Sequence, residues 1–139
     1  ARYLGVAQEE VGTLSLQADD PETVSSICAV LAETDVINMV SRGISSENIL
    51  KGIHLSMAGR LIKLLKAIKV RDSTVLVTGG LARDEGLCRA LQEQASDQKL
   101  AVQIRTHTDS IFAGAIGAAI WGEFRYRKLN QAEASPLAA

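Results

Sequence analysis

Apolar residues recur along the first part of the chain at the spacing of helices. Residues 8–16 keep this spacing and predict a short helix. From Ile27 the apolar positions again follow helical spacing, and this second helix is expected to end near Gly43, because glycine is a natural stop at a helix C-terminus. Ser25 or Ser26 is the expected N-cap of the second helix.

A third helix is predicted to be long. Ser45 or Ser46 is expected to cap its start, since a serine side chain accepts a hydrogen bond from one of the first free backbone amides. Lysines come late in the segment, where positive charge suits the negative end of the helix dipole. Its apolar face is expected to consist of Ile49, Ile53, Met57, Leu61, Leu64 or Leu65, and Ile68.

A strand, a helix and a second strand are predicted next. The run Thr74–Thr78 is apolar at its centre, which is typical of a buried strand, and a glycine pair follows it. Asp84 to about Gln94 has helical spacing. The inward face of that helix is expected to be Leu87, Ala90 and Leu91. Val102 and Ile104 alternate with polar residues and predict the second strand. Such a βαβ unit pairs its strands in parallel, so the expected fold class is α/β with several packed helices.

The last predicted helix runs over about residues 111–128, with Asp109 or Ser110 as its cap. Its first half, residues 113–119, is rich in alanine and glycine. Because glycine inside a helix costs roughly 1 kcal/mol relative to alanine, this face is expected to pack closely against another element. The basic residues expected in its last turn are Arg125, Arg127 and Lys128.

Composition narrows the class of protein. The 139 residues are 47% apolar and 22% charged, which supports a folded domain and not a disordered chain. A net charge of −1 creates no global field, so neither nucleic acid nor a membrane is expected as a partner. No apolar run reaches the roughly 18–20 residues that span a bilayer, and a cytoplasmic location is expected. The small, polar residues 130–139 are expected to form a disordered tail.

Gly79-Gly80 follows the first predicted strand, where open α/β sheets bind ligands. Two glycines let a ligand approach the backbone closely, although such pairs are also common in plain tight turns. The order of segments, Val75–Ala82 followed by Asp109–Ala119, resembles the adenosine-binding end of the superfamily of acetate and sugar kinases, heat-shock chaperones and actin. That resemblance implies that Gly79 and Gly80 bind the adenosine part of ATP, with Leu81 as a backbone neighbour.

The two cysteines of the chain do not form a disulfide framework. A lone cysteine such as Cys28 is most often a small buried residue. The surrounding segment Ser25–Ile37, however, resembles the second cysteine motif of one ATPase family, formed by the ATPase subunits of benzoyl-CoA reductase and the activators of 2-hydroxyacyl-CoA dehydratases. The resemblance continues through Ile53–Arg60 and the glycine turn to Gly122. The segments closest to the reductase subunits are Thr106–Ile111 and Trp121–Arg125.

This resemblance implies an actin-like, ribonuclease H-like ATPase, of which residues 1–129 would be the carboxy-terminal part. Two such domains in this family hold one [4Fe–4S] cluster, and Cys28 would be one of its metal ligands. The other implied cofactor is ATP or ADP with Mg²⁺. ATP hydrolysis would drive low-potential electrons to the reduction of the aromatic ring of benzoyl-CoA. The implied partners are a homologous ATPase subunit across the cluster, reductase subunits that carry the acyl-CoA site, and a low-potential electron donor such as ferredoxin.

The sequence departs from this family at its amino-terminal side. It contains neither the first cluster cysteine nor the phosphate-binding hairpin and acidic magnesium residues, so we expect no catalytic residue in this chain, no ATPase activity and no cluster held by the chain alone. The residues interpreted as structural or surface groups are Cys88, His54, His107, Asp84 and Glu85. Three other functions stay open: a dehydratase activator, a small-molecule kinase of the same superfamily, and an interaction module.

Overall fold

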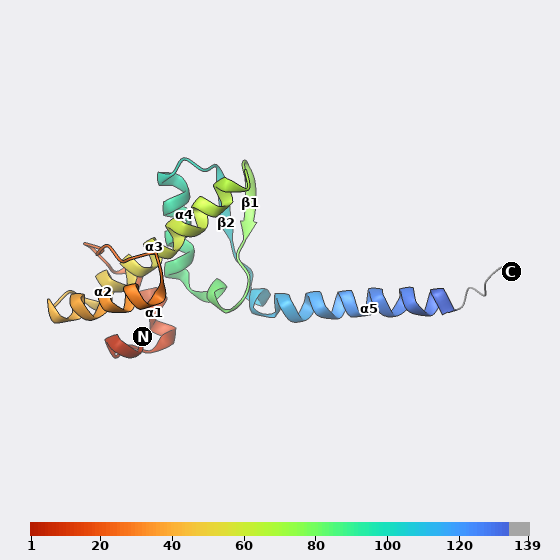
Figure 1. The fold of residues 1–139 in the computed structure, drawn as a ribbon, viewed down its shortest axis with the longest axis horizontal. Coiled ribbons are helices and arrows are strands. Elements are labelled where there is room, and N and C mark those ends of the chain that lie inside the picture. The colour runs from red at the N-terminus through yellow and green to blue at the C-terminus, as the bar shows by residue number, and fades with distance from the viewer. Residues whose placement is uncertain (134–139) are drawn as a thin grey trace.

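The structure is a computed structural model that describes residues 1–133 (Figure 1). The helices and strands of this part of the chain are α1 (Val11–Leu16), α2 (Ala29–Ser41), α3 (Ser46–Ala67), β1 (Ser73–Leu76), α4 (Glu85–Asp97), β2 (Val102–Arg105) and α5 (Ala113–Glu133). Short 3-10 helices lie at Arg2–Leu4, Gln8–Glu10, Gly80–Arg83 (η3) and Thr108–Phe112 (η4). None of the helices within residues 1–133 is both long and apolar enough to cross a membrane.

Local signals set most of the helix boundaries. The Ser45 hydroxyl accepts a hydrogen bond of 3.3 Å from the amide of Asn48, which confirms Ser45 as the cap of α3. Gly43 lies two residues after the last residue of α2 and has a φ of 76°, the left-handed conformation that glycine favours at helix ends. The predicted cap of α2 is wrong, because Cys28 holds this position and both predicted serines lie in the loop before it.

The predicted βαβ unit is confirmed. Strands β1 and β2 pair in parallel, with Ser73 opposite Val102 and α4 between them in the chain. The prediction that the first strand is buried is wrong: Val75 is half-buried, and its neighbour Leu76 is exposed. In residues 1–133 the sheet has two strands and helices cover one of its faces, so residues on the other face stay accessible.

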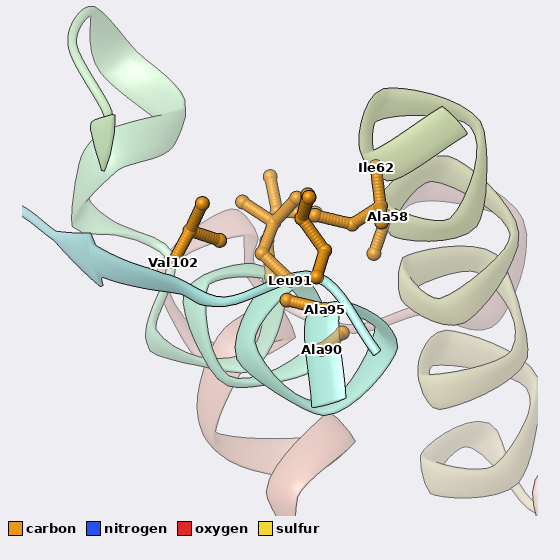
Figure 2. Close-up of a cluster of buried hydrophobic side chains, with 8 residues drawn as sticks. Ala58, Ile62, Ala90, Leu91, Ala95 and Val102 are labelled. Carbon is orange, nitrogen blue, oxygen red and sulfur yellow. The ribbon is translucent and has the colours of Figure 1, made fainter. Parts of the chain in front are cut away.

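The main core lies between α3, α4 and the sheet (Figure 2). Ala58 and Ile62 of α3 are fully buried against α4 and β2. From α4 the buried residues are Leu87, Ala90, Leu91 and Ala95, which confirms the predicted inward face. Small alanines on both helices let their backbones approach closely, and burial of a side chain such as Ile62 contributes about 1.5–3 kcal/mol.

The apolar face predicted for α3 is only partly correct. Ile49 is fully buried, but the rest of the buried row is Leu50, His54, Ala58 and Ile62, one position further along the chain. One residue turns the helix surface by about 100°, so the predicted Met57 and Leu61 lie on another side and are exposed. The sequence pattern predicted that the larger side chains are buried. The structure instead buries His54 and Ala58, at the contact between α3 and α4.

Helix α5 leaves the rest of the molecule as a single projecting rod (Figure 1). Neither predicted residue caps it, because η4 precedes it. The N-cap of η4 is His107, whose ring accepts a hydrogen bond from the Asp109 amide. The helix continues to Glu133, four residues into the predicted tail and past the predicted basic last turn; residues 134–139 lie outside the described residues. Close packing of its small residues is not seen: a Cβ added at Gly114 or Gly117 would meet nothing within 4 Å.

Candidate functional site

The glycine turn lies where β1 and β2 end side by side. The Val77 amide donates to the carbonyl of Arg105, and the Gly79 amide donates to the carbonyl of Ser110, both at 2.8 Å. These two bonds tie the segment after β1 to the segment after β2 and bring η3 against η4. The two chain segments expected beyond the ends of the strands therefore lie next to each other.

The turn presents an open backbone surface. Gly79 has a φ of 87°, a backbone conformation that residues other than glycine rarely adopt. A Cβ added at Gly79 or Gly80 would meet nothing within 4 Å, so space lies beside both residues. Leu81 is 56% exposed next to them, while Ala82 is buried and anchors the turn. This arrangement can accept a flat ligand against the backbone with an apolar side chain beside it.

Cys28 lies in a second region, at the start of α2. Its thiol is free and the residue is exposed. Its backbone carbonyl accepts the first hydrogen bond of the helix, from the Ala32 amide at 3.1 Å. A thiolate in this place would meet the positive end of the dipole of a helix of 13 residues. Helix position, exposure and residue type together suit a metal ligand.

An apolar pocket of about 470 Å³ opens beside Cys28. Its wall is formed by α2, by the loop before it and by Ile53, Met57 and Arg60 of α3. The Arg60 guanidinium donates to the carbonyl of Ser26 at 3.2 Å, two residues before the cysteine. The Ser25 amide donates to the Asp35 carboxylate at 2.8 Å. The loop that leads to Cys28 is therefore held by α3 on one side and α2 on the other.

Cys28 and Cys88 are the two thiols that this chain offers to a metal cluster. A [4Fe–4S] cluster takes four thiolates, and no group of three or more potential metal ligands occurs among residues 1–133. Cys88 is half-buried, and burial raises the pKa of its thiol, with Asp84 and Glu85 acting in the same direction. A raised pKa disfavours the thiolate that a metal requires, which agrees with a structural role for Cys88. Cys28 could supply one ligand and other chains or segments the rest.

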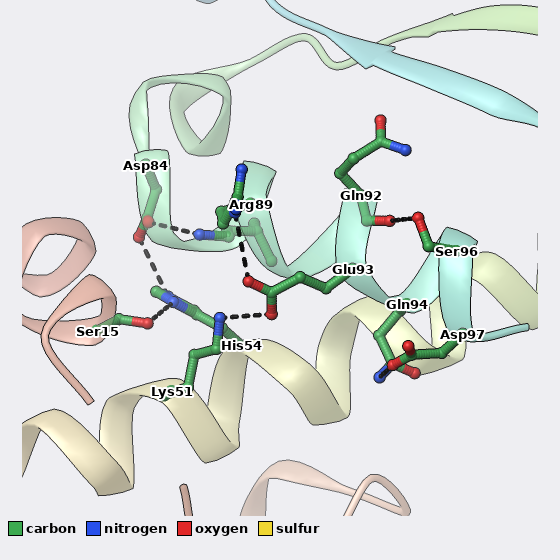
Figure 3. A network of polar contacts seen from close by, with 11 residues as sticks. Ser15, Lys51, His54, Asp84, Arg89, Gln92, Glu93, Gln94, Ser96 and Asp97 are labelled. Atoms are coloured by element: carbon green, nitrogen blue, oxygen red, sulfur yellow. Dashed lines mark hydrogen bonds and ion pairs between the residues drawn. The ribbon is translucent and has the colours of Figure 1, made fainter. Parts of the chain in front are cut away.

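The sequence-based reasoning missed a buried polar network between these two regions (Figure 3). The ring of His54, on α3, lies between Ser15 of α1 and Asp84 at the start of α4. Nδ1 of His54 is 2.8 Å from the Ser15 hydroxyl, and Nε2 is 3.2 Å from the Asp84 carboxylate. The other carboxylate oxygen of Asp84 accepts a hydrogen bond from the Leu87 amide, so Asp84 also caps α4.

Close backbone packing encloses this network. A Cβ at Gly86 would come within 2.9 Å of Nδ1 of His54 and within 2.7 Å of the Gly12 carbonyl. Ser15 and His54 are 1% and 5% exposed. Burial lowers the pKa of His54; Asp84 opposes this shift and Lys51 adds to it. A neutral ring satisfies both neighbours, with the Ser15 hydroxyl donating to Nδ1 and the Nε2 proton donated to Asp84.

His54 is thus a core residue, as one of the two predicted possibilities stated, whereas His107 is exposed. The partners of His54 could not be predicted from sequence spacing, because Ser15 lies 39 positions before His54 on another helix. The one available signal was a histidine between two apolar residues, Ile53 and Leu55, in the predicted long helix, followed much later by an aspartate at a helix start. That signal indicates a buried pair only once α3 and α4 are known to pack together.

Comparison with known proteins places both regions in context. Residues 1–122 match the model of the BadF/BadG/BcrA/BcrD ATPase family. Over 93% of its length the chain is 70% identical to a benzoyl-CoA reductase subunit of Thauera aromatica, and covers 46% of that protein. Over 96% of its length it is 35% identical to the 2-hydroxyisocaproyl-CoA dehydratase activator of Clostridioides difficile, and covers 47% of it. The chain spans about half the length of these relatives.

Solved structures agree with these matches. The activator of the 2-hydroxyisocaproyl-CoA dehydratase from Clostridium difficile, with bound ADPNP, superposes with a TM-score of 0.80 at 32% identity, covering 100% of this chain and 49% of that one. A component of the (R)-2-hydroxyglutaryl-CoA dehydratase of Acidaminococcus fermentans gives a TM-score of 0.76 at 33% identity, over 87% and 44% of the two chains. The expected actin-like α/β fold is confirmed, and the chain belongs to the BadF/BadG/BcrA/BcrD ATPase family.

Proposed function

We propose that this chain is the carboxy-terminal part of an ATP-hydrolysing electron-activase subunit of a benzoyl-CoA reductase. The full protein would drive low-potential electrons through a [4Fe–4S] cluster shared between two ATPase subunits, toward reduction of the aromatic ring. One observation carries this proposal: an exposed cysteine at a helix N-terminus, in a chain 70% identical to a benzoyl-CoA reductase subunit.

The nucleotide would bind at the glycine turn. We assign Gly79 and Gly80 to the adenosine part of ATP, with Leu81 beside it, because the turn offers open backbone and an exposed apolar side chain. A homologous solved structure has ADPNP bound, which supports a nucleotide as the ligand. The triphosphate and its Mg²⁺ would need groups outside this chain, so the 139-residue chain alone should not hydrolyse ATP.

The cluster would be held in part by Cys28. When bound, a [4Fe–4S] cluster supplies one-electron transfer at low potential. The contribution of this chain is to present the thiolate at the positive end of α2 and to fix the loop before it through Arg60 and Asp35. Four thiolates are needed, so we propose that a homologous ATPase subunit completes the site. The other partners would be the reductase subunits with the acyl-CoA site and a low-potential donor such as ferredoxin, in the cytoplasm.

A second candidate is the activator ATPase of a 2-hydroxyacyl-CoA dehydratase. It is supported by 35% identity to such an activator and by the superposition on one. Both candidates use the same nucleotide turn and the same cysteine, and they differ in the acceptor of the electron. Identification of the subunits that co-purify with the full-length protein separates them: reductase subunits support the first, dehydratase subunits the second.

Nucleotide binding at the turn can be tested by calorimetric titration of ADPNP into the full-length protein. Gly80→Val adds a branched side chain at the turn, and its Cβ meets nothing within 4 Å in the free chain. We expect it to weaken ADPNP binding at least about tenfold, equivalent to about 1.4 kcal/mol. Ala101→Val creates the same side chain at an exposed position at the other end of the sheet and should leave binding unchanged. Equal binding by parent and Gly80→Val would refute the assignment.

A further inference from the structure

The polar network around His54 lies between the glycine turn, to which we assign the nucleotide, and the loop with Cys28, to which we assign the cluster. Asp84 directly follows η3, the single turn that starts at Gly80. It is therefore three residues from Leu81, in the segment that a bound adenosine would contact. From there its carboxylate reaches His54 in the middle of α3.

Helix α3 in turn holds the loop that carries Cys28, at three points. At its start, the Asn48 side chain accepts hydrogen bonds from the amides of Asp19 and Asp20 at 3.1 and 3.0 Å. One turn later, the loop lies so close that a Cβ on Gly52 would be 2.1 Å from the carbonyl oxygen of Glu22. Two turns beyond that, Arg60 holds the Ser26 carbonyl. These contacts span about 18 Å along a rigid element.

We infer that His54 is a positioning residue that couples the nucleotide turn to the Cys28 loop through α3. The inference rests on the proposed function, because it needs a nucleotide at the turn and a role for Cys28. A shift of η3 moves Asp84, and the buried hydrogen bond transmits that shift to His54. The ring has no free space into which it could shift, because the backbones of α1 and α4 are in contact beside it at Gly12 and Gly86.

The energetic basis is the burial of the network. A buried donor or acceptor that loses its partner costs about 1–3 kcal/mol. His54 has one ring nitrogen on Ser15 and the other on Asp84, so it follows both partners when either moves. An apolar contact in the same place would tolerate sliding, whereas two directional bonds to one ring fix its orientation. A displacement of either partner is therefore passed on to the ring.

The link does not depend on the neighbouring surface ion pair. Lys51 also lies on α3 and contacts Glu93 of α4 at 2.6 Å, with Arg89 on the other oxygen of that carboxylate at 3.4 Å. This pair connects the same two helices but reaches the middle of α4, not the end of η3. Lys51→Met is therefore a matched control that removes a contact between α3 and α4 and leaves the path to the turn intact.

The test uses the full-length protein, stripped of metal and kept under anaerobic conditions. The rate of alkylation of Cys28 by iodoacetamide is measured by mass spectrometry with and without ADPNP, with added glutathione as the reference thiol. We expect ADPNP to change the rate for Cys28 about fivefold in the parent and in Lys51→Met. At saturating ADPNP the change should fall to about twofold or less in His54→Gln and in the second variant Asp84→Asn. The Kd for ADPNP of His54→Gln, a residue outside the turn, should stay within about twofold of the parent value.

The outcomes separate two kinds of failure. If the parent does not bind ADPNP, the proposed function fails and this inference fails with it. If the parent binds ADPNP and responds, but folded His54→Gln or Asp84→Asn responds equally, the proposed function stands and the link through His54 is wrong. A parent that binds ADPNP without any change at Cys28 also overturns the link. Asn at position 84 can still cap α4, so this variant keeps the test decisive if His54→Gln does not fold.

Discussion

Helices α3 and α5 are similar in length and both carry large apolar residues, yet they differ completely in what covers them. α3 buries one row of side chains against α4 and α1, including the fully buried Ile62. α5 exposes its apolar residues, among them Trp121 at 62% and Ile120 at 66%, and its glycines face open space. The comparison shows that one face of α3 has its packing partners within these residues, while α5 has an apolar surface without a partner among them.

The largest expected effect is a difference in stability between truncating a side chain on α3 and truncating one on α5. Ile62→Ala should lower the free energy of unfolding by about 2–5 kcal/mol, because it leaves a cavity in a closely packed core. Ile120→Ala on α5 should change it by about 0.5 kcal/mol or less. Urea unfolding of the purified chain, followed by circular dichroism, measures both. Equal losses would show that α5 is packed in solution.

Glycine substitutions sharpen the comparison by giving opposite signs. Gly52→Ala places a Cβ 2.1 Å from the Glu22 carbonyl and should destabilise the chain by about 1–3 kcal/mol. Gly117→Ala lies inside α5 in open space and should stabilise the helix by up to about 1 kcal/mol. The midpoints of thermal unfolding should therefore move in opposite directions. A loss of stability in Gly117→Ala would indicate a close neighbour on that face.

Removing the cap of α3 should have a smaller effect on the free energy of unfolding. Ser45→Ala removes the acceptor for the Asn48 amide and should cost about 1 kcal/mol. The corresponding position before α5 is in η4, so Asp109→Ala, which removes no cap, should be close to neutral. Chemical denaturation of the two variants gives the difference. Equal losses in both would contradict the caps as described.

The smallest expected effect is on the dependence of stability on pH. Burial lowers the pKa of His54 in the folded chain, so the unfolded chain binds more protons below its ordinary value of about 6.5. The contribution of His54 is therefore fully present above about pH 6.5 and is lost as the pH falls toward the folded pKa. His54→Gln should show a flatter stability profile between pH 7 and pH 5 than the parent. An unchanged profile would mean that the folded ring is not protected from protonation.

Local sequence signals predicted where helices and strands lie better than they predicted which of these elements are buried. The cap at Ser45, the stop at Gly43 and the parallel βαβ unit follow from short-range chemistry, and the structure confirms them. The exposure of β1 and α5 could not be predicted, because it depends on what lies beside them and not on their own residues. The same holds for His54, whose role follows from partners on two other helices.

The most direct test concerns Cys28 as a cluster ligand. Iron and acid-labile sulfide are measured in the anaerobically purified full-length protein, in Cys28→Ser and in the control Cys88→Ser. We predict about four irons for each pair of ATPase domains in the parent and in Cys88→Ser, and loss of most of the iron and sulfide in Cys28→Ser. A Cys28→Ser protein that keeps the iron content of the parent would contradict the proposed role of this residue.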